Sequence, residues 1–213
     1  MNGPEPSVFA LLDARLTQDS HPSFFFAGLG AEQLSQYPMN LLGRLKQTPQ
    51  SPKHHPEGNV WNHTMLVVDA AAQRRAQSSN PQALLWAALL HDIGKPATTR
   101  TRRGRITSYD HDKVGAGLAR EFLLAAGGPE ALARQVEPLV RWHMQLLFVT
   151  GGLPFADIKG MKAQVNLHEV ALLGLCDRLG RLGADPAREQ QNIRLFLQKC
   201  GLPPLGERQP QSR

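Results

Sequence analysis

The sequence predicts an all-α protein folded as one compact helical bundle. Apolar residues recur at helical spacing in most of the longer segments, as at Val8, Leu12 and Leu16. Prolines and glycines separate these segments, and no long stretch alternates apolar with polar residues as a half-buried strand does. With 213 residues, of which 41% are apolar, the chain is long enough to bury one substantial core.

The early part of the chain predicts short helices. Apolar spacing indicates a helix at 7–17, and the three phenylalanines at 24–26 form an apolar patch that we expect to pack on the bundle. Pro38 divides one or two short helices within 32–45, because proline does not continue a helix. We expect an N-terminal helical extension at 1–40, a main domain at 41–202 and a mobile tail at 203–213.

The middle of the chain predicts two successive helices. A loop at 47–58, rich in proline, lysine and histidine, leads into a helix that begins at 59 or 60, carries His63 and runs to about 76. Pro81 favours the start of the next helix, since proline suits the first helical turn. This second helix runs to His91, where glycine and proline soon follow and stop it.

Beyond these helices the pattern changes and then returns to helix. Residues 98–109 are rich in threonine and arginine, which predicts a short exposed hairpin or an extended loop. Further helices are expected at 110–126, 129–144, 167–182 and 186–200, with a short helix or irregular segment at 155–164. These segments carry His111, His143 and Asp177.

Charge and cysteine content narrow the class of protein. The net charge of +6 and the pI near 9.7 suit an anionic partner such as a nucleotide or RNA, or simply a mildly basic surface. Cys176 and Cys200 lack the spacing of a disulfide scaffold or a zinc knuckle. No signal pattern and no apolar run of membrane-spanning length is present, so we expect a cytoplasmic protein without a membrane partner.

The run from Leu89 to Lys95 contains the most informative pair of residues. An apolar helix ends there in His91 and Asp92, and both side chains are good metal ligands. The other candidate ligands at helix-compatible positions are His63, His111, His143 and Asp177. Four imidazoles and two carboxylates suit Mn, Fe, Co, Ni or Zn better than Mg, which prefers oxygen ligands. The sequence therefore predicts a site for one or two divalent transition-metal ions.

Such a site points to chemistry on phosphate esters. A bound divalent ion lowers the pKa of a coordinated water to about 7 and neutralises phosphate oxygens. The sequence contains no phosphate-binding Gly-x-x-x-x-Gly-Lys loop and no serine-centred nucleophile elbow, which argues against a kinase or a serine hydrolase. We therefore interpret the chain as a metal-dependent phosphohydrolase.

Five stretches of sequence carry a resemblance to a known family. They lie at 55–64, 91–96, 109–112, 141–144 and 177–181. On these residues the chain resembles the HD superfamily of metal-dependent phosphohydrolases. Over roughly 41–183 it is similar to the HD domain of bacterial multifunctional tRNA nucleotidyltransferases and to RNA end-healing HD phosphoesterases. We do not expect 213 residues to hold the nucleotidyltransferase head as well, and CCA addition is not inferred.

The resemblance implies a role for each matching residue. The implied ligands of a first metal are His63, His91, Asp92 and Asp177. His111 and His143, together with Asp92, match the ligands of a second metal in the branch of the family that binds two ions. Asp92 and Lys95 match catalytic positions, and Lys95 matches a residue that contacts the scissile phosphate. Arg178, Arg181 and Glu57 match positions that contact substrate or place a neighbouring side chain.

The arginines of the predicted hairpin form a dense positive segment beside the expected metal site. Arg100 and Arg103 are candidate substrate-binding residues that guide RNA or a nucleotide electrostatically. An ordinary solvated hairpin explains the same arginines. Tyr109 is the aromatic residue of this segment and the candidate for base stacking.

The resemblance implies hydrolysis of nucleotides, or of RNA ends that carry 2′,3′-cyclic, 2′- or 3′-phosphates, by metal-activated water. One alternative is a nucleotidase or nucleoside-polyphosphate hydrolase of the same fold. Those relatives usually carry a Glu-Asp pair after the His-Asp motif, where this chain has arginine and threonine. Another is a non-catalytic, metal-stabilised domain that binds RNA or a partner. The exact substrate, the number of ions and the oligomeric state stay open.

Overall fold

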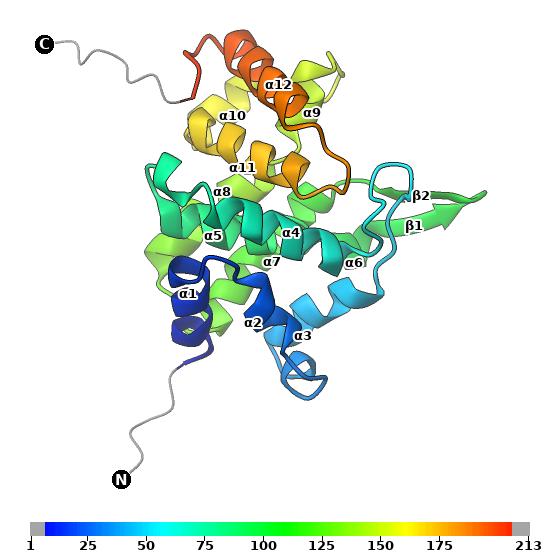
Figure 1. Ribbon diagram of the computed structural model, residues 1–213, viewed down its shortest axis with the longest axis vertical. Coiled ribbons are helices and arrows are strands. Elements are labelled where there is room, and N and C mark those ends of the chain that lie inside the picture. The colour runs from blue at the N-terminus through cyan, green and yellow to red at the C-terminus, as the bar shows by residue number, and fades with distance from the viewer. Residues whose placement is uncertain (1–6, 206–213) are drawn as a thin grey trace, which may run out of the picture.

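The structure, a computed structural model, describes residues 7–205 and confirms the all-α architecture (Figure 1). The α-helices are α1 (Val8–Gln18), α2 (Ser23–Ala27), α3 (Met39–Gly43), α4 (Val60–Ala72), α5 (Pro81–Leu90), α6 (Lys95–Thr98), α7 (His111–Ala125), α8 (Glu130–Trp142), α9 (Gln145–Thr150), α10 (Ile158–Gln164), α11 (Leu167–Leu179) and α12 (Pro186–Lys199). Short 3-10 turns lie at Gln33–Ser35, Arg44–Gln47 and Arg75–Gln77.

The predicted hairpin is present and projects away from the bundle (Figure 1). Strands β1 (Thr99–Arg102) and β2 (Arg105–Ser108) pair antiparallel, with Thr99 opposite Ser108. The chain then enters α7 through Asp110, whose φ of 59° lies in the left-handed region that aspartate tolerates better than most residues. This turn makes His111 the first residue of α7.

Helix α5 forms the centre of the bundle. Its residues from Ala83 to Leu90 are all buried, as expected of a helix that is apolar on every side. It contacts α1, α4, α7, α8 and α11. The side chain of Asn80 caps its start by accepting a hydrogen bond from the backbone N of Ala83. Because α5 is central, the two residues after its last turn, His91 and Asp92, also lie inside the bundle.

The turn after α5 packs closely on the first turns of α7. At Gly94 a Cβ atom would overlap the carbonyl oxygen of His111 and would lie 2.6 Å from the backbone N of Gly115. Both neighbours are backbone atoms, which cannot rotate out of the way. The absence of a side chain at Gly94 is therefore what lets the His91–Asp92 turn approach α7.

Several boundaries differ from those expected from sequence. Helix α4 ends at Ala72 rather than near 76, and a short 3-10 turn follows it. Helix α9 was not predicted, because its apolar run has no capping residue to mark a start. Of the phenylalanine patch, Phe26 is fully buried whereas Phe24 is 75% exposed.

The expected N-terminal extension belongs to the same core as the rest of the bundle. Leu12 and Leu16 of α1 and Phe26 of α2 are buried in one hydrophobic cluster with α5. The loose start at 1–6 and most of the tail predicted at 203–213 lie outside the described residues. Within residues 7–205, no helix is long and apolar enough to cross a membrane.

Candidate metal centre

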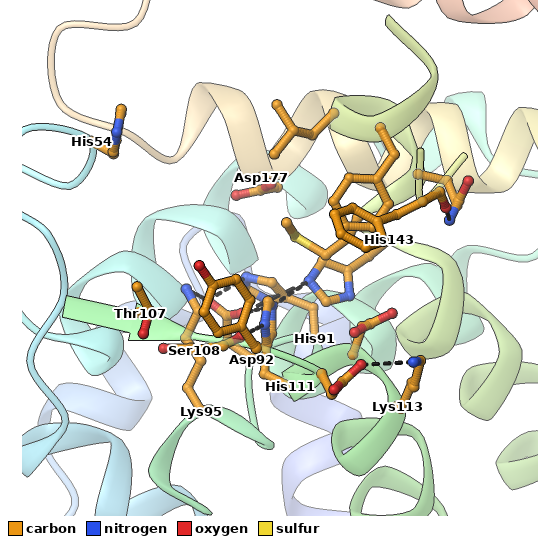
Figure 2. A pocket seen from close by; sticks show the side chains of 18 of the residues that line it. His54, His91, Asp92, Lys95, Thr107, Ser108, His111, Lys113, His143 and Asp177 are labelled. Carbon is orange, nitrogen blue, oxygen red and sulfur yellow. Dashed lines mark hydrogen bonds and ion pairs between the residues drawn. The ribbon is translucent and has the colours of Figure 1, made fainter. Parts of the chain in front are cut away.

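The six side chains predicted as ligands come from separate parts of the fold and lie close together. Figure 2 shows His91, Asp92, His111, His143 and Asp177 on the wall of one cavity. His63 lies on α4, His91 and Asp92 on the turn after α5, His111 at the start of α7, His143 just after α8 and Asp177 on α11. All six are buried. Most of the six lie at or next to the end of a helix, so the backbone determines the direction of each side chain.

Asp92 lies between two groups of histidines. Its Oδ2 atom is 3.2 Å from Nε2 of His91 and 3.9 Å from Nε2 of His63. Its Oδ1 atom is 3.3 Å from Nε2 of His111 and 3.8 Å from Nε2 of His143. Each carboxylate oxygen therefore faces a different pair of imidazoles. We call His63, His91, Asp92 and Asp177 the first group, and Asp92, His111 and His143 the second group.

Asp177 joins the first group through His63. Its Oδ1 atom is 3.0 Å from Nε2 of His63, and the guanidinium of Arg181 donates to both of its oxygens at 3.3 Å. A close approach of α11 to α4 makes this possible, since a Cβ at Gly180 would lie 2.9 Å from the backbone N of Val67. His63, His91 and Asp92 each offer one ligand atom to the first group, and these three atoms lie within 4.8 Å of one another.

The far nitrogens of three histidines are held by backbone carbonyls. In each case Nδ1 lies near the carbonyl oxygen of the residue three positions earlier. The pairs are His91 with Ala88 at 2.9 Å, His111 with Ser108 at 2.7 Å and His143 with Val140 at 2.7 Å. Because a carbonyl only accepts, Nδ1 of each ring is the donor, which leaves Nε2 as the nitrogen available to a metal ion. These Nε2 atoms are the ones that face Asp92.

His63 is held by a carboxylate instead. Its Nδ1 atom is 2.9 Å from Oε1 of Glu57, and the same oxygen is 2.9 Å from Nδ1 of His55. The backbone N of Leu182 donates to the other oxygen of Glu57 at 3.3 Å. Burial alone would raise the pKa of Glu57, but these partners, His63 foremost, lower it to about 2. Glu57 lies behind His63 and does not line the cavity, so its position fits support of a ligand rather than contact with substrate.

The electrostatics of the cluster favour a cation. Burial alone would raise the pKa of Asp92, but His91 and Lys95 hold it well below its usual value, so the carboxylate is charged. Burial, with the neighbouring His111 as the second cause, lowers the pKa of His143 to about 3, so this ring is neutral. The Nε2 atoms of His111 and His143 are only 3.2 Å apart, and Nε2 of His91 is buried with no hydrogen-bond partner among residues 7–205. These nitrogen lone pairs and a buried anion are the donor set of a divalent transition metal.

Lys95 lies inside the site and is not a solvated lysine at a helix end. Its side chain is 11% exposed, and its Nζ atom is 2.7 Å from Oδ2 of Asp92. It also donates to Oε1 of Gln50 at 2.6 Å. No sequence pattern indicates this role for Gln50, which lies in a proline-rich loop 45 residues earlier. The ammonium is therefore fixed beside the ligands, as expected of a group that contacts a phosphate next to them.

A cavity of about 1070 Å³ opens over the cluster, with His91, Asp92, His111 and His143 on its surface. Arg178 and Arg181 line it as well. Arg178 has no carboxylate within 4 Å among residues 7–205, whereas Arg181 is paired with Asp177. Arg100 and Arg103 do not line this cavity, since both are exposed on the hairpin. A role for them in guiding substrate stays a prediction.

We expect Glu57→Gln to weaken binding of Mn²⁺ about 10- to 100-fold, because the carboxylate that orients a ligating histidine tunes its affinity. Isothermal titration of the purified protein with Mn²⁺ measures this. Glu169→Gln is the matched control, since Glu169 is also buried but accepts hydrogen bonds from Ser78 and Ser79 far from the cluster. Equal Mn²⁺ affinity in the two variants would contradict the role of Glu57 in orienting His63.

The sequence matches the HD domain family over residues 60–182, more than half of the chain. It is 40% identical over 176 residues to the multifunctional CCA protein of Aromatoleum aromaticum, covering 80% of this chain and 42% of that protein.

Two further relatives carry the same name. The multifunctional CCA protein of Methylococcus capsulatus is 29% identical over 191 residues, covering 88% of this chain and 38% of the relative. The multifunctional CCA protein of Actinobacillus pleuropneumoniae serotype 5b is 42% identical over 79 residues, covering 37% of this chain and 19% of the relative. The chain thus spans less than half the length of each of these relatives. With more than half of its own length matched, the chain belongs to the HD domain family.

Proposed function

We propose that this protein is a metal-dependent phosphohydrolase that cleaves 2′,3′-cyclic, 2′- or 3′-phosphate esters of nucleotides or RNA ends. The observation that carries the proposal is the position of Asp92, whose two oxygens face separate histidine pairs. With a carboxylate placed in this way, the first and the second group would each hold an ion, and Asp92 would serve both. We therefore propose two ions, drawn from Mn, Co, Ni, Fe and Zn, because most of the donors are imidazoles.

Each side chain around the cluster has a task in such a reaction. When bound, divalent ions at this site lower the pKa of a coordinated water to about 7 and offset charge on phosphate oxygens. Lys95, fixed beside Asp92, places a positive charge where a phosphate would contact the ligands. Arg178 lines the same cavity and has no carboxylate within 4 Å in the described part of the chain, so its guanidinium is available for bidentate binding of a phosphate. Arg181 holds Asp177 in position.

The similarity to multifunctional CCA proteins supports an RNA end as the source of the ester. The hairpin arginines and the net charge of +6 agree with an anionic substrate. Polyphosphate substrates remain the alternative within the same fold, and they are distinguished by experiment below.

The test is a substrate panel run after metal removal. We expect protein stripped by a chelator to be inactive, and Mn²⁺, Co²⁺ or Ni²⁺ to restore hydrolysis of 2′,3′-cyclic AMP, 2′-AMP or 3′-AMP. Mg²⁺ is expected to restore much less, because it prefers an all-oxygen shell. Release of phosphate, or conversion of the cyclic ester, is followed by chromatography. Turnover of nucleoside triphosphates alone would favour the alternative. Tight metal binding without turnover of any ester would contradict the proposal.

A further inference from the structure

A second and smaller cavity adjoins the one above the metal centre. Its volume is about 350 Å³, and it shares His54, Arg178 and Arg181 with the larger cavity. Its other walls come from the loop before α4, which carries Lys53, from the connection between α11 and α12, and from the start of α12, which carries Arg188. We call it the side cavity.

The side cavity is strongly positive. Lys53, Arg178 and Arg188 line it, and none of them has a carboxylate within 4 Å among the residues that the structure describes. The one acidic residue on its wall, Glu189, accepts a hydrogen bond from Asn192 at 2.9 Å. Burial lowers the pKa of Arg178, and the nearby Arg181 lowers it further. Several cations that face one small cavity without anionic partners form a site for a phosphate group.

The larger cavity has a wall of a different kind. Tyr109, 77% exposed, and Phe155, 65% exposed, both line it. Phe148 lies beside Phe155, with ring centroids 5.6 Å apart and planes inclined at 57°. Exposed aromatic faces at the rim of a phosphate-binding cavity are the groups on which nucleic-acid bases stack.

We infer that the two cavities together bind the end of a single-stranded RNA. The terminal phosphate lies at the metal centre, the base of the terminal nucleotide stacks on the aromatic wall, and the phosphodiester to the preceding nucleotide lies in the side cavity. A mononucleotide esterified only at its 2′ and 3′ positions fills the larger cavity and leaves the cations of the side cavity unpaired. This inference rests on the proposed function, because that function places the terminal phosphate.

Arg188 and Arg194 form a matched pair for the test. Both lie on α12, both are exposed, and neither has an ion-pair partner among residues 7–205, but only Arg188 lines the side cavity. The efficiency kcat/KM is measured for 2′,3′-cyclic AMP and for an RNA trinucleotide that ends in the same cyclic phosphate. We expect the wild type to prefer the trinucleotide about tenfold or more, since it makes one additional charged contact. Arg188→Ala should lose most of this preference, and Arg194→Ala should keep it.

Binding gives a readout that does not depend on turnover. The affinity for a fluorescently labelled RNA trinucleotide is measured by anisotropy over a range of salt concentrations. Loss of one phosphate contact to a single strand lowers the slope of log affinity against log salt by about 0.7. We expect this change in Arg188→Ala and not in Arg194→Ala.

The aromatic wall is tested with a second pair. Phe155→Ala should raise KM for both substrates, whereas Phe24→Ala, which removes a 75% exposed phenylalanine elsewhere on the surface, should raise neither. Equal efficiency on the two substrates, or equal behaviour of the two arginine variants, would overturn the inference while leaving the proposed function intact. Absence of turnover on every ester would contradict the proposed function, and an Arg188-dependent salt slope would still support the side cavity.

Discussion

Asp92→Asn is expected to reduce turnover to about one thousandth of the wild-type value or less, because both groups of ligands depend on this carboxylate. Asparagine keeps the size of the side chain but offers only one oxygen, and its NH₂ group cannot bind a cation. One of the two groups therefore loses the oxygen that residue 92 supplies to it, and the negative charge that attracts both ions is gone. We expect the metal content to fall from two ions per chain to one or none.

Elemental analysis of the dialysed protein measures the metal content, and the assay on 2′,3′-cyclic AMP measures turnover. Glu169→Gln serves as the control, because it also neutralises a buried carboxylate but leaves the cluster untouched. If Asp92→Asn kept two ions and wild-type turnover, the central role of this carboxylate would be disproved.

Gly94→Ala is expected to lower the free energy of unfolding by about 1–3 kcal/mol, as overpacking does in other tightly packed interiors. The added Cβ would meet the carbonyl oxygen of His111 and the backbone N of Gly115, so the turn and α7 must separate. The same movement pulls Asp92 away from His111. We therefore expect weaker binding of Mn²⁺ together with the loss of stability.

Gly117→Ala is the matched control on α7. A Cβ at Gly117 would meet no atom within 4 Å, and alanine in a helix is favoured over glycine by about 0.5–1 kcal/mol. Urea unfolding should show the two variants moving in opposite directions. A Gly94→Ala protein as stable as the wild type would show that the turn and α7 do not depend on this close contact.

The sequence was sufficient to predict most helices and to single out six side chains that the structure places close together. Helical spacing of apolar residues located α1, α5, α7 and α8, and glycine or proline marked where several of them end. His63, His91 and Asp92 stood out because imidazoles and carboxylates at the ends of apolar helices are unusual. The distances between the six side chains depend on how α4, α7, α8 and α11 pack against α5. The spacing of residues along the chain does not contain that information.

Other features of the site had no local signal. Glu57 contacts His63 because the loop before α4 folds back, and the Pro-Glu-Gly sequence alone does not show to which side its carboxylate points. Gln50 meets Lys95 only through a tertiary contact. His55 belongs to the loop at 47–58, yet its side chain is only 12% exposed and lies against Glu57. Burial lowers its pKa to about 4, with Lys95 adding to the effect, and no sequence pattern carries that information.

The carbonyls that hold His91, His111 and His143 each belong to the residue three positions earlier. The orientation of each imidazole ring is therefore determined within one turn of its own segment. The distances between the rings depend instead on how the segments pack against one another. Substitutions in the surrounding packing can widen or narrow those gaps without turning any ring. Residues that never contact an ion can thus change which ionic radius the site prefers. The ligand atoms themselves stay the same.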